Sequence, residues 1–212
     1  MIWILVNEIF LSIQGESLSA GFPTIFVRFT GCNLRCSYCD TRYAYNAGVK
    51  MSPESIFNDV QKHYYKRVCL TGGEPLLQKD LPELLKLLLD YEVSIETNGS
   101  IDISDIKLID KHHFVMDMKV PSSEVSEKML FKNFNFLRDF DEIKFVIGSR
   151  SDYEWAREVI KDYYKKGIIT FSPIFGSVEY RNIVDWILED KLDVRFQLQL
   201  HKIIWDPEKR GV

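Results

Sequence analysis

The sequence predicts an α/β fold whose mainly parallel sheet closes only part of a barrel. Strand-like runs alternate with helix-like segments along all 212 residues, and no linker, repeat or low-complexity segment interrupts them. Such alternation is typical of βαβ units. Polar or glycine-containing turns follow several strand-like runs, where parallel sheets and barrels place their ligands. About six units can be counted, fewer than the eight of a full barrel. We therefore expect a partial (β/α)6-type TIM barrel with short or missing helices.

Composition narrows the class of protein. A chain of this length can bury a sizeable core, and we expect one domain over residues 1–212. The net charge of −4 provides no global attraction to nucleic acid or to an acidic membrane. No apolar run approaches the ~20 residues that span a bilayer. The apolar N-terminus is short and lacks a basic leader, so we expect a first strand there and not a signal peptide.

The first elements are predicted from alternation and capping. A strand or extended arm is expected over 6–14, and a strand over 24–29 leads into a cysteine-rich loop. A serine, a proline and a glutamate at 52–54 provide an N-cap, a first-turn proline and an early acid. This combination predicts a helix that runs to about residue 65.

The later elements repeat the same signals. Asp80 and Glu83 form a capping-box pattern ahead of a leucine-rich helix, and Ser151 and Glu154 start another helix, which Gly167 ends. The remaining helical segments are expected near residue 104, at 124–131, where the signal is weaker, and from about 178 to 189. The remaining strands are expected over 67–71, 92–96, 113–118, 142–147, 168–172 and 193–199.

Three of the four cysteines lie in one loop. Cys32, Cys36 and Cys39 have the spacing C-x3-C-x2-C, and iron–sulfur clusters are held by such thiolates. A structural zinc site normally takes four ligands, whereas this loop offers three. Spacing alone leaves open a cluster, a zinc ion completed by a distant histidine, or ordinary thiols. Free thiolates fit a reducing cytoplasm, the compartment that we expect. The fourth cysteine, Cys69, has apolar neighbours and is interpreted as a core residue.

A second motif favours the cluster. The strand at 67–71 is followed at once by Gly72-Gly73-Glu74-Pro75, and paired glycines let a backbone approach a ligand closely. A C-x3-C-x2-C loop followed by a strand that ends in this motif resembles the radical S-adenosylmethionine (SAM) superfamily.

Further motifs, spread over nearly the whole chain, narrow the resemblance. They are Ile13-Gln14-Gly15-Glu16, Arg28, Cys39-Asp40-Thr41, Thr71 with the glycine pair, Glu96-Thr97-Asn98-Gly99, Lys119 with Pro121-Ser122-Ser123, and Gln199-Leu200-His201-Lys202. With these motifs the chain resembles the 7-carboxy-7-deazaguanine synthases, radical SAM enzymes of 7-deazapurine (queuosine and archaeosine) biosynthesis.

The resemblance implies a reaction and its cofactors. The family converts 6-carboxy-5,6,7,8-tetrahydropterin to 7-carboxy-7-deazaguanine with loss of ammonia. A 4Fe-4S cluster would bind the three loop cysteines, and SAM would chelate the open iron and yield the radical that takes hydrogen from the pterin. No catalytic side chain is then expected, because the cofactor carries the radical chemistry. The family also implies Mg2+, a flavodoxin or ferredoxin type electron donor, a homodimer, and no nucleic-acid or membrane partner.

The resemblance also assigns binding residues. The residues expected to contact SAM are Tyr38, Asp40, Gly73, Glu74, Asp117, Met118 and Lys119. Those expected to contact the pterin are Ile13, Gln14, Gly15, Glu16, Arg28, Thr71 and His201, and Thr41 would hold Mg2+. Two departures from the family pattern stand out. Asp117-Met118-Lys119 replaces the usual Ser-Pro-Lys, which puts side-chain contacts at 117 and 118 in doubt, and Ser17 replaces a glycine.

Alternatives remain at the level of residues and of function. Arg28 could be an outward surface charge on its strand, and Thr41 could simply cap the following turn. A glycyl-radical-enzyme activase would share the cysteine spacing but would need an open face for a protein substrate. A non-enzymatic zinc-binding protein is the other alternative.

Overall fold

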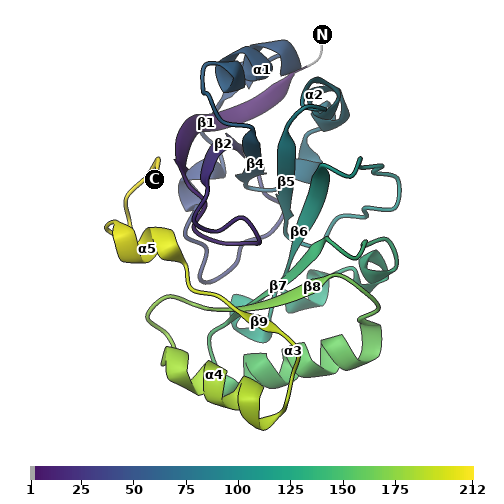
Figure 1. The fold of residues 1–212 in the computed structure, drawn as a ribbon, viewed down its shortest axis with the longest axis vertical. Helices are drawn as coiled ribbons and strands as arrows, with labels where there is room; N and C mark the ends of the chain where they lie inside the picture. The colour runs from purple at the N-terminus through teal and green to yellow at the C-terminus, as the bar shows by residue number, and fades with distance from the viewer. Residues whose placement is uncertain (1–2) are drawn as a thin grey trace.

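A computed structural model describes residues 3–212, so the first two positions of the apolar N-terminus lie outside the described residues. Within these residues one sheet has the strand order β3-β1-β2-β4-β5-β6-β7-β8-β9, and it curves through the molecule in Figure 1. Its strands are β1 (Ile4–Ile13), β2 (Pro23–Phe29), β3 (Val49–Met51), β4 (Arg67–Gly72), β5 (Glu92–Thr97), β6 (His112–Met118), β7 (Glu142–Ile147), β8 (Ile168–Pro173) and β9 (Arg195–Phe196).

Strand direction confirms the predicted partial barrel. Each neighbouring pair from β2 to β9 runs parallel, whereas β1 pairs antiparallel with β2 and with β3. The strands β3 and β9 form the two edges, so the sheet does not close on itself. Since the carboxyl ends of parallel strands share one rim, the loops that follow β2, β4, β5 and β6 come together there.

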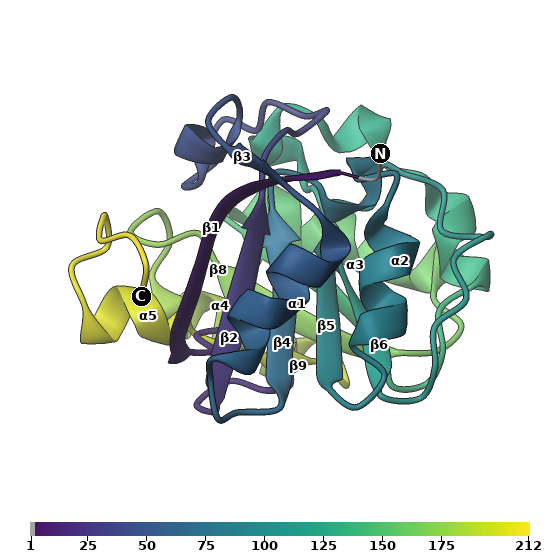
Figure 2. The same cartoon turned by 90° about the horizontal axis from the view of Figure 1, so that it is seen from above.

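Few helices cover the outside of the sheet, as the sequence predicts. They are α1 (Pro53–Gln61), α2 (Leu81–Leu87), α3 (Arg150–Tyr163), α4 (Tyr180–Glu189) and α5 (Leu200–Ile204). The first two lie beside β1, β4 and β5, and α3 and α4 lie together beyond β7 and β8 (Figures 1 and 2). Ser52 caps α1 by accepting a hydrogen bond from the Ser55 N–H at 3.2 Å. None of the helices within residues 3–212 is long and apolar enough to cross a membrane.

Short 3₁₀ turns replace longer helices elsewhere. They are η1 (Arg42–Ala44), η2 (Pro75–Leu77), η3 (Pro121–Ser123), η4 (Ser126–Lys128) and η5 (Phe131–Asn135). The turn η4 and the first residue of η5 occupy the region where a weaker helix was expected at 124–131, and η3 precedes it. The core contains large apolar side chains of the strands, such as Phe29, Leu70, Ile95, Phe145 and Phe171, all fully buried.

Several predicted boundaries are wrong for local reasons. No helix forms near Ser104, because the buried side chain of Asn133 bonds the backbone of Ile101 and Ile103 and holds this segment as a loop. The helix predicted from Ser151 is capped instead by Ser149, whose Oγ accepts from the Asp152 N–H at 3.2 Å. This helix ends at Tyr163, before Gly167.

Two other elements are shorter than predicted. The helix expected to reach residue 65 ends at 61, and the strand expected over 193–199 is limited to two residues. The segments β3 and α5 are absent from the sequence-based prediction, because neither shows an alternation or a cap signal of its own.

Candidate active site

One cavity lies at the carboxyl-terminal rim of the sheet. Its volume is about 240 Å³, room for an organic ligand and not merely for a single water. Residues from β1, β2, β4, β5, β6 and β7 line it, together with the cysteine loop and α5. The cavity therefore occupies the place where parallel α/β sheets hold their ligands.

The cavity brings together most of the predicted site residues. Its lining includes Ile13, Gln14, Gly15, Glu16, Arg28, Cys32, Cys36, Tyr38, Cys39, Asp40, Thr41, Thr71, Gly73, Asp117, Lys119 and His201. Glu74 and Met118 are fully buried and do not belong to the lining. At these two positions a side-chain contact with SAM has no support in the structure, and at Met118 this is the contact that the departure from Ser-Pro-Lys already puts in doubt.

Glu74 instead holds the walls of the cavity together. One of its carboxylate oxygens accepts from the Thr97 hydroxyl at 2.8 Å and from the Leu76 N–H at 3.0 Å. The other accepts from the Asn98 N–H at 2.7 Å. Burial raises the pKa of Glu74 to about 7. The side chain thus joins the turn after β4 to the end of β5.

The glycines before Glu74 permit a close backbone contact. Gly72 has a φ of +123°, and a Cβ added at Gly73 would lie 1.9 Å from the Gly31 carbonyl oxygen. The Gly73 N–H donates to the carbonyl of Phe29 at 3.1 Å, and the Glu74 N–H donates to that of Gly31 at 2.8 Å. The glycine turn is therefore bonded to the base of the cysteine loop.

The three loop thiols face the cavity in a partly buried setting. The Leu34 N–H donates to Cys32 Sγ at 3.4 Å, and Asn98 Nδ2 lies 3.7 Å from the same sulfur. Burial raises the pKa of Cys32, and it raises that of Cys36 to about 11. Cys32 and Cys36 are therefore protonated near neutral pH, so metal binding would displace protons from these two thiols.

The side chains present fit a cluster with a polar cofactor. Cys32, Cys36 and Cys39 line one cavity, and iron–sulfur clusters are held by cysteine thiolates. The Tyr38 hydroxyl and Asp117 Oδ1 are buried at the cavity without a hydrogen-bond partner in the described residues. Such atoms suit a polar ligand.

Arg28 points into the cavity with its orientation held. Its Nε donates to Glu8 Oε1 at 2.8 Å, and the same oxygen accepts from the Tyr43 hydroxyl at 2.9 Å. The guanidinium lies 5.8 Å from the ring centres of both Phe10 and Tyr43. This side chain is 15% exposed, so it is not the outward surface charge considered above. The bond through Nε leaves the two terminal nitrogens to hold an anion.

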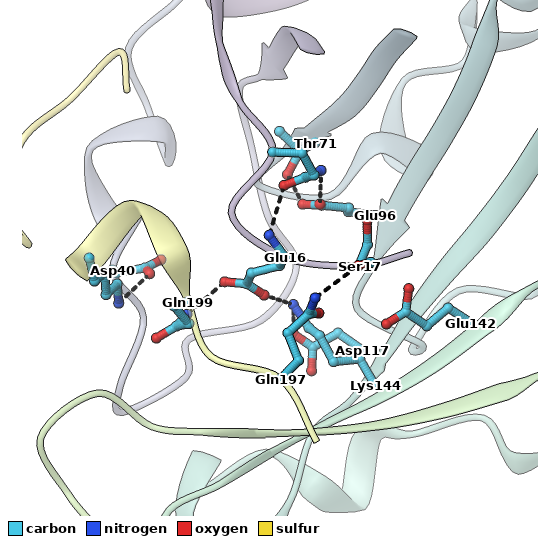
Figure 3. Close-up of polar contacts among 12 residues, drawn as sticks. Glu16, Ser17, Asp40, Thr71, Glu96, Asp117, Glu142, Lys144, Gln197 and Gln199 are labelled. Atoms are coloured by element: carbon cyan, nitrogen blue, oxygen red, sulfur yellow. Dashed lines mark hydrogen bonds and ion pairs between the residues drawn. The ribbon is translucent and has the colours of Figure 1, made fainter. Parts of the chain in front are cut away.

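Glu96 fixes two further predicted residues. It accepts from the Thr71 hydroxyl at 2.7 Å and from Gln14 Nε2 at 3.4 Å, as Figure 3 shows for Thr71. Because these contacts use the hydroxyl hydrogen of Thr71, its oxygen is left to accept a bond from a ligand.

A paired acid and lysine lie deeper in the cavity. Glu16 Oε2 is 2.6 Å from Lys144 Nζ, and its other oxygen accepts from Gln199 Nε2 at 2.7 Å (Figure 3). Burial alone would raise the pKa of Glu16, but Lys144, His201 and the two hydrogen bonds lower it to about 2. Glu16 is therefore an anion at neutral pH, available to groups that donate N–H bonds.

Thr41 stands beside a second acid at the mouth of the cavity. Its hydroxyl donates to Asp40 Oδ1 at 2.9 Å, and the other oxygen of Asp40 is paired with Lys202 at 2.9 Å. Thr41 precedes η1 but makes no side-chain cap. The alternative of a simple turn cap therefore has no support, and the pair offers two oxygens to a hard cation.

The short helix α5 completes the wall. The Leu200 N–H donates to the Gly15 carbonyl at 3.0 Å, and a Cβ at Gly15 would lie 2.1 Å from His201 Nδ1. Only glycine lets His201 lie against this turn. Burial lowers the pKa of His201, so the ring is neutral near physiological pH.

Sequence reasoning assigns no role to Lys144, Glu8 or Glu96, although Glu96 belongs to one of the motifs that carry the resemblance. A signal exists for Lys144, since it is the one cation within the run Glu142–Ile147, every residue of which is buried. Glu96 follows apolar residues at the end of a strand, the position typical of ligand-binding groups. Glu8 shows no local signal, because its role depends on the strand that pairs with it.

A family comparison agrees with this geometry. The model of the radical SAM superfamily matches residues 26–185. The chain is 45% identical to a 7-carboxy-7-deazaguanine synthase of Clostridium acetobutylicum over 98% of both chains. It is 44% identical to another of Methanospirillum hungatei over 95% of this chain and 86% of the other.

A solved structure has the same fold. The crystal structure of QueE from Escherichia coli superposes with a TM-score of 0.79, at 23% identity, over 94% of this chain and 95% of that one. At this identity the likeness concerns the fold alone.

The Glu16–Lys144 pair predicts a pH dependence of stability. A carboxylate whose pKa falls from 4.5 to about 2 on folding stabilises the protein fully above pH 4.5. This contribution is lost as the pH falls toward 2. Between about pH 5 and about pH 3, the free energy of unfolding of the cluster-free wild type should fall about 2 kcal/mol more than that of Glu16→Gln. Urea titrations measure the difference. Glu158→Gln, at an exposed pair with Lys161, is the control, and parallel pH curves for the wild type and Glu16→Gln would contradict the prediction.

Proposed function

The chain belongs to the 7-carboxy-7-deazaguanine synthase family of the radical SAM superfamily, and from this premise we propose how its residues carry out the reaction. The proposed substrate is 6-carboxy-5,6,7,8-tetrahydropterin, which loses ammonia to give 7-carboxy-7-deazaguanine. One observation carries the proposal: the three loop cysteines, Arg28 and Glu16 line a single cavity.

The cysteine loop would hold the cofactors on one side of this cavity. Cys32, Cys36 and Cys39 would bind a 4Fe-4S cluster, and the backbone at Gly73 would receive the amino group of SAM. Tyr38, Asp40 and Lys119 would line the rest of the SAM site. When bound, the cluster and SAM supply a radical that removes a hydrogen atom and is regenerated, so the net conversion needs no external oxidant.

The opposite wall would hold the pterin. Arg28 would bind its carboxylate through the two terminal guanidinium nitrogens. Ile13, Gln14 and Gly15 would frame the ring edge, Thr71 and His201 would contact it, and Glu16 would accept from its guanidine-like N–H groups. These contacts orient the reacting carbon toward the cysteine loop, and the surrounding walls exclude water.

Several broader features belong to the same proposal. We propose a homodimer, a cytoplasmic location, and a flavodoxin or ferredoxin type protein as electron donor. Mg2+ would bind at Thr41 together with the pterin. The activase alternative has no observation in its favour, because the substrate-side residues line a cavity and not an open face.

A direct experiment tests the function. The protein is reconstituted anaerobically with iron and sulfide, reduced, and incubated with SAM and the carboxypterin. We expect a brown protein, a product with deazaguanine absorbance, and one ammonia released for each product. A colourless protein that holds zinc after reconstitution and forms no product would overturn the proposal.

The cysteine assignment predicts a sharp division among four variants. Cys32→Ala, Cys36→Ala and Cys39→Ala should each lose the cluster and SAM cleavage, because three thiolates hold it. Cys69→Ala should keep both, since Cys69 is fully buried in β4, outside the cavity lining. Iron content and visible absorbance measure the cluster. Full iron loading in any loop variant would disprove the ligand set.

Arg28→Lys should impair pterin binding although the charge is kept. Lysine loses the planar fork and cannot bond Glu8 and a carboxylate at fixed angles. The loss of one charge-assisted bond should cost on the order of 2 kcal/mol, an increase of about 30-fold in KM for the pterin. The affinity for SAM alone, measured by calorimetry without pterin, should not change. An unchanged KM would show that Arg28 does not hold the substrate carboxylate.

Thr41→Ala should remove most of the response to magnesium. Mg2+ prefers six oxygens and usually keeps several waters, so a threonine hydroxyl and oxygens of the substrate would share the site. Added Mg2+ should raise turnover of EDTA-treated wild type and of Thr41→Ser, which keeps the oxygen. Full activity of the wild type without Mg2+, or an equal response in Thr41→Ala, would place the metal elsewhere.

A further inference from the structure

Four buried charges of alternating sign form a row across the cavity. Glu16 Oε2 lies 2.6 Å from Lys144 Nζ, Lys144 Nζ lies 3.7 Å from Asp117 Oδ2, and Lys119 Nζ lies 2.9 Å from the same Asp117 oxygen. The side chains are between 10% and 17% exposed. Figure 3 shows Glu16, from the turn after β1, close to Lys144 of β7 and Asp117 of β6. The row runs from the proposed pterin edge at Glu16 to the proposed SAM side at Lys119.

Asp117 is the shared member of this row. Both lysines approach its Oδ2, while its Oδ1 has no hydrogen-bond partner within the described residues. Lys144 makes a short hydrogen bond to Glu16, but its 3.7 Å contact with Asp117 is too long for one. Lys144 is therefore held mainly by Glu16, and Asp117 holds mainly Lys119.

A ligand at Glu16 would change this division. Each Glu16 oxygen already accepts one bond, from Lys144 and from Gln199. Each oxygen can accept a second bond, but a ligand that donates N–H groups to Glu16 shares the negative charge that holds Lys144 and so weakens this pair. Lys144 is too buried to turn to water. Asp117 is the remaining anion that it contacts. As Lys144 moves toward Asp117, repulsion between the two lysines frees Lys119 to pair with the carboxylate of another ligand.

We infer that the row Glu16–Lys144–Asp117–Lys119 couples the two ligand sites, so that pterin binding tightens SAM binding and SAM binding tightens pterin binding. The inference rests on the proposed function. The two arrangements of the lysines are the two states, and each ligand prefers the same one. Thermodynamic linkage then requires the effect to be equal in both directions.

Calorimetry on the anaerobic holoenzyme tests the coupling directly. The cluster is kept oxidised and no reductant is added, so that SAM is bound without being cleaved. In the wild type, saturating carboxypterin should lower the Kd of SAM by about fivefold or more, and saturating SAM should lower the Kd of the pterin by the same factor. In Asp117→Asn both factors should fall close to one. Asp102→Asn, which removes a carboxylate from an exposed pair with Lys132, should keep the coupling of the wild type.

A second variant keeps the test decisive if Asp117→Asn loses its cluster or its fold, which absorbance and thermal unfolding would reveal. Lys144→Gln breaks the row at its centre and leaves the Lys119–Asp117 pair in place, so it should also remove the coupling.

No coupling in the wild type, or full coupling in a folded, cluster-bearing variant at either position, overturns the inference. If both ligands bind and react but show no coupling, the inference is overturned and the proposed function stands. Failure of the carboxypterin to bind or react at all would overturn the proposed function with it.

Discussion

The contact between the glycine turn after β4 and the base of the cysteine loop is the constraint on which the rest of the site depends. It requires residue 73 to be glycine, because a Cβ would collide with the carbonyl of Gly31. The two N–H bonds made at this contact fix where β2 ends and where the loop begins. The same turn places Glu74 where it accepts a hydrogen bond from the Asn98 N–H, and the side chain of Asn98 lies against Cys32 Sγ. The surroundings of one thiol are thus set by the ends of three adjacent strands.

The opposite wall depends on buried charge. Taking Glu16, Lys144, Asp117 and Lys119 out of water costs several kcal/mol per ion, and the attraction between partners offsets this cost only when the geometry is good. Apolar side chains of equal volume at these four positions would stabilise the fold at least as well. The charges are therefore better explained by ligand chemistry than by stability. Their alternation makes the row of two acids and two lysines neutral overall, so each charge has a partner within the protein.

The sequence predicts correctly the features that depend on neighbouring residues. The prediction fails where contacts with distant segments determine the local structure. The cysteine loop, the glycine turn and the cap of α1 depend on neighbouring residues, and the structure has them where they are predicted. The loop near Ser104 carries a helical pattern, but Asn133, some 30 residues away, bonds its backbone. The contact between Glu8 and Arg28 is visible only once the register of β1 and β2 is known. Glu74 shows the same limit, since its motif predicts a ligand contact and its burial does not support one.

The two halves of the site also differ in how far apart in the sequence their contacting residues lie. The cysteine loop lies between β2 and β4, which are parallel neighbours joined by the contact at Gly31. The opposite wall instead needs both ends of the chain: Gln199 bonds Glu16 across 183 positions, and Gln197 bonds the Ser17 carbonyl across 180. Closing a longer loop costs more conformational entropy, although the cost rises only slowly with length. The contacts of this wall must therefore offset a larger entropy cost than those of the cysteine loop, and the docking of α5 on Gly15 is one of the contacts that does so.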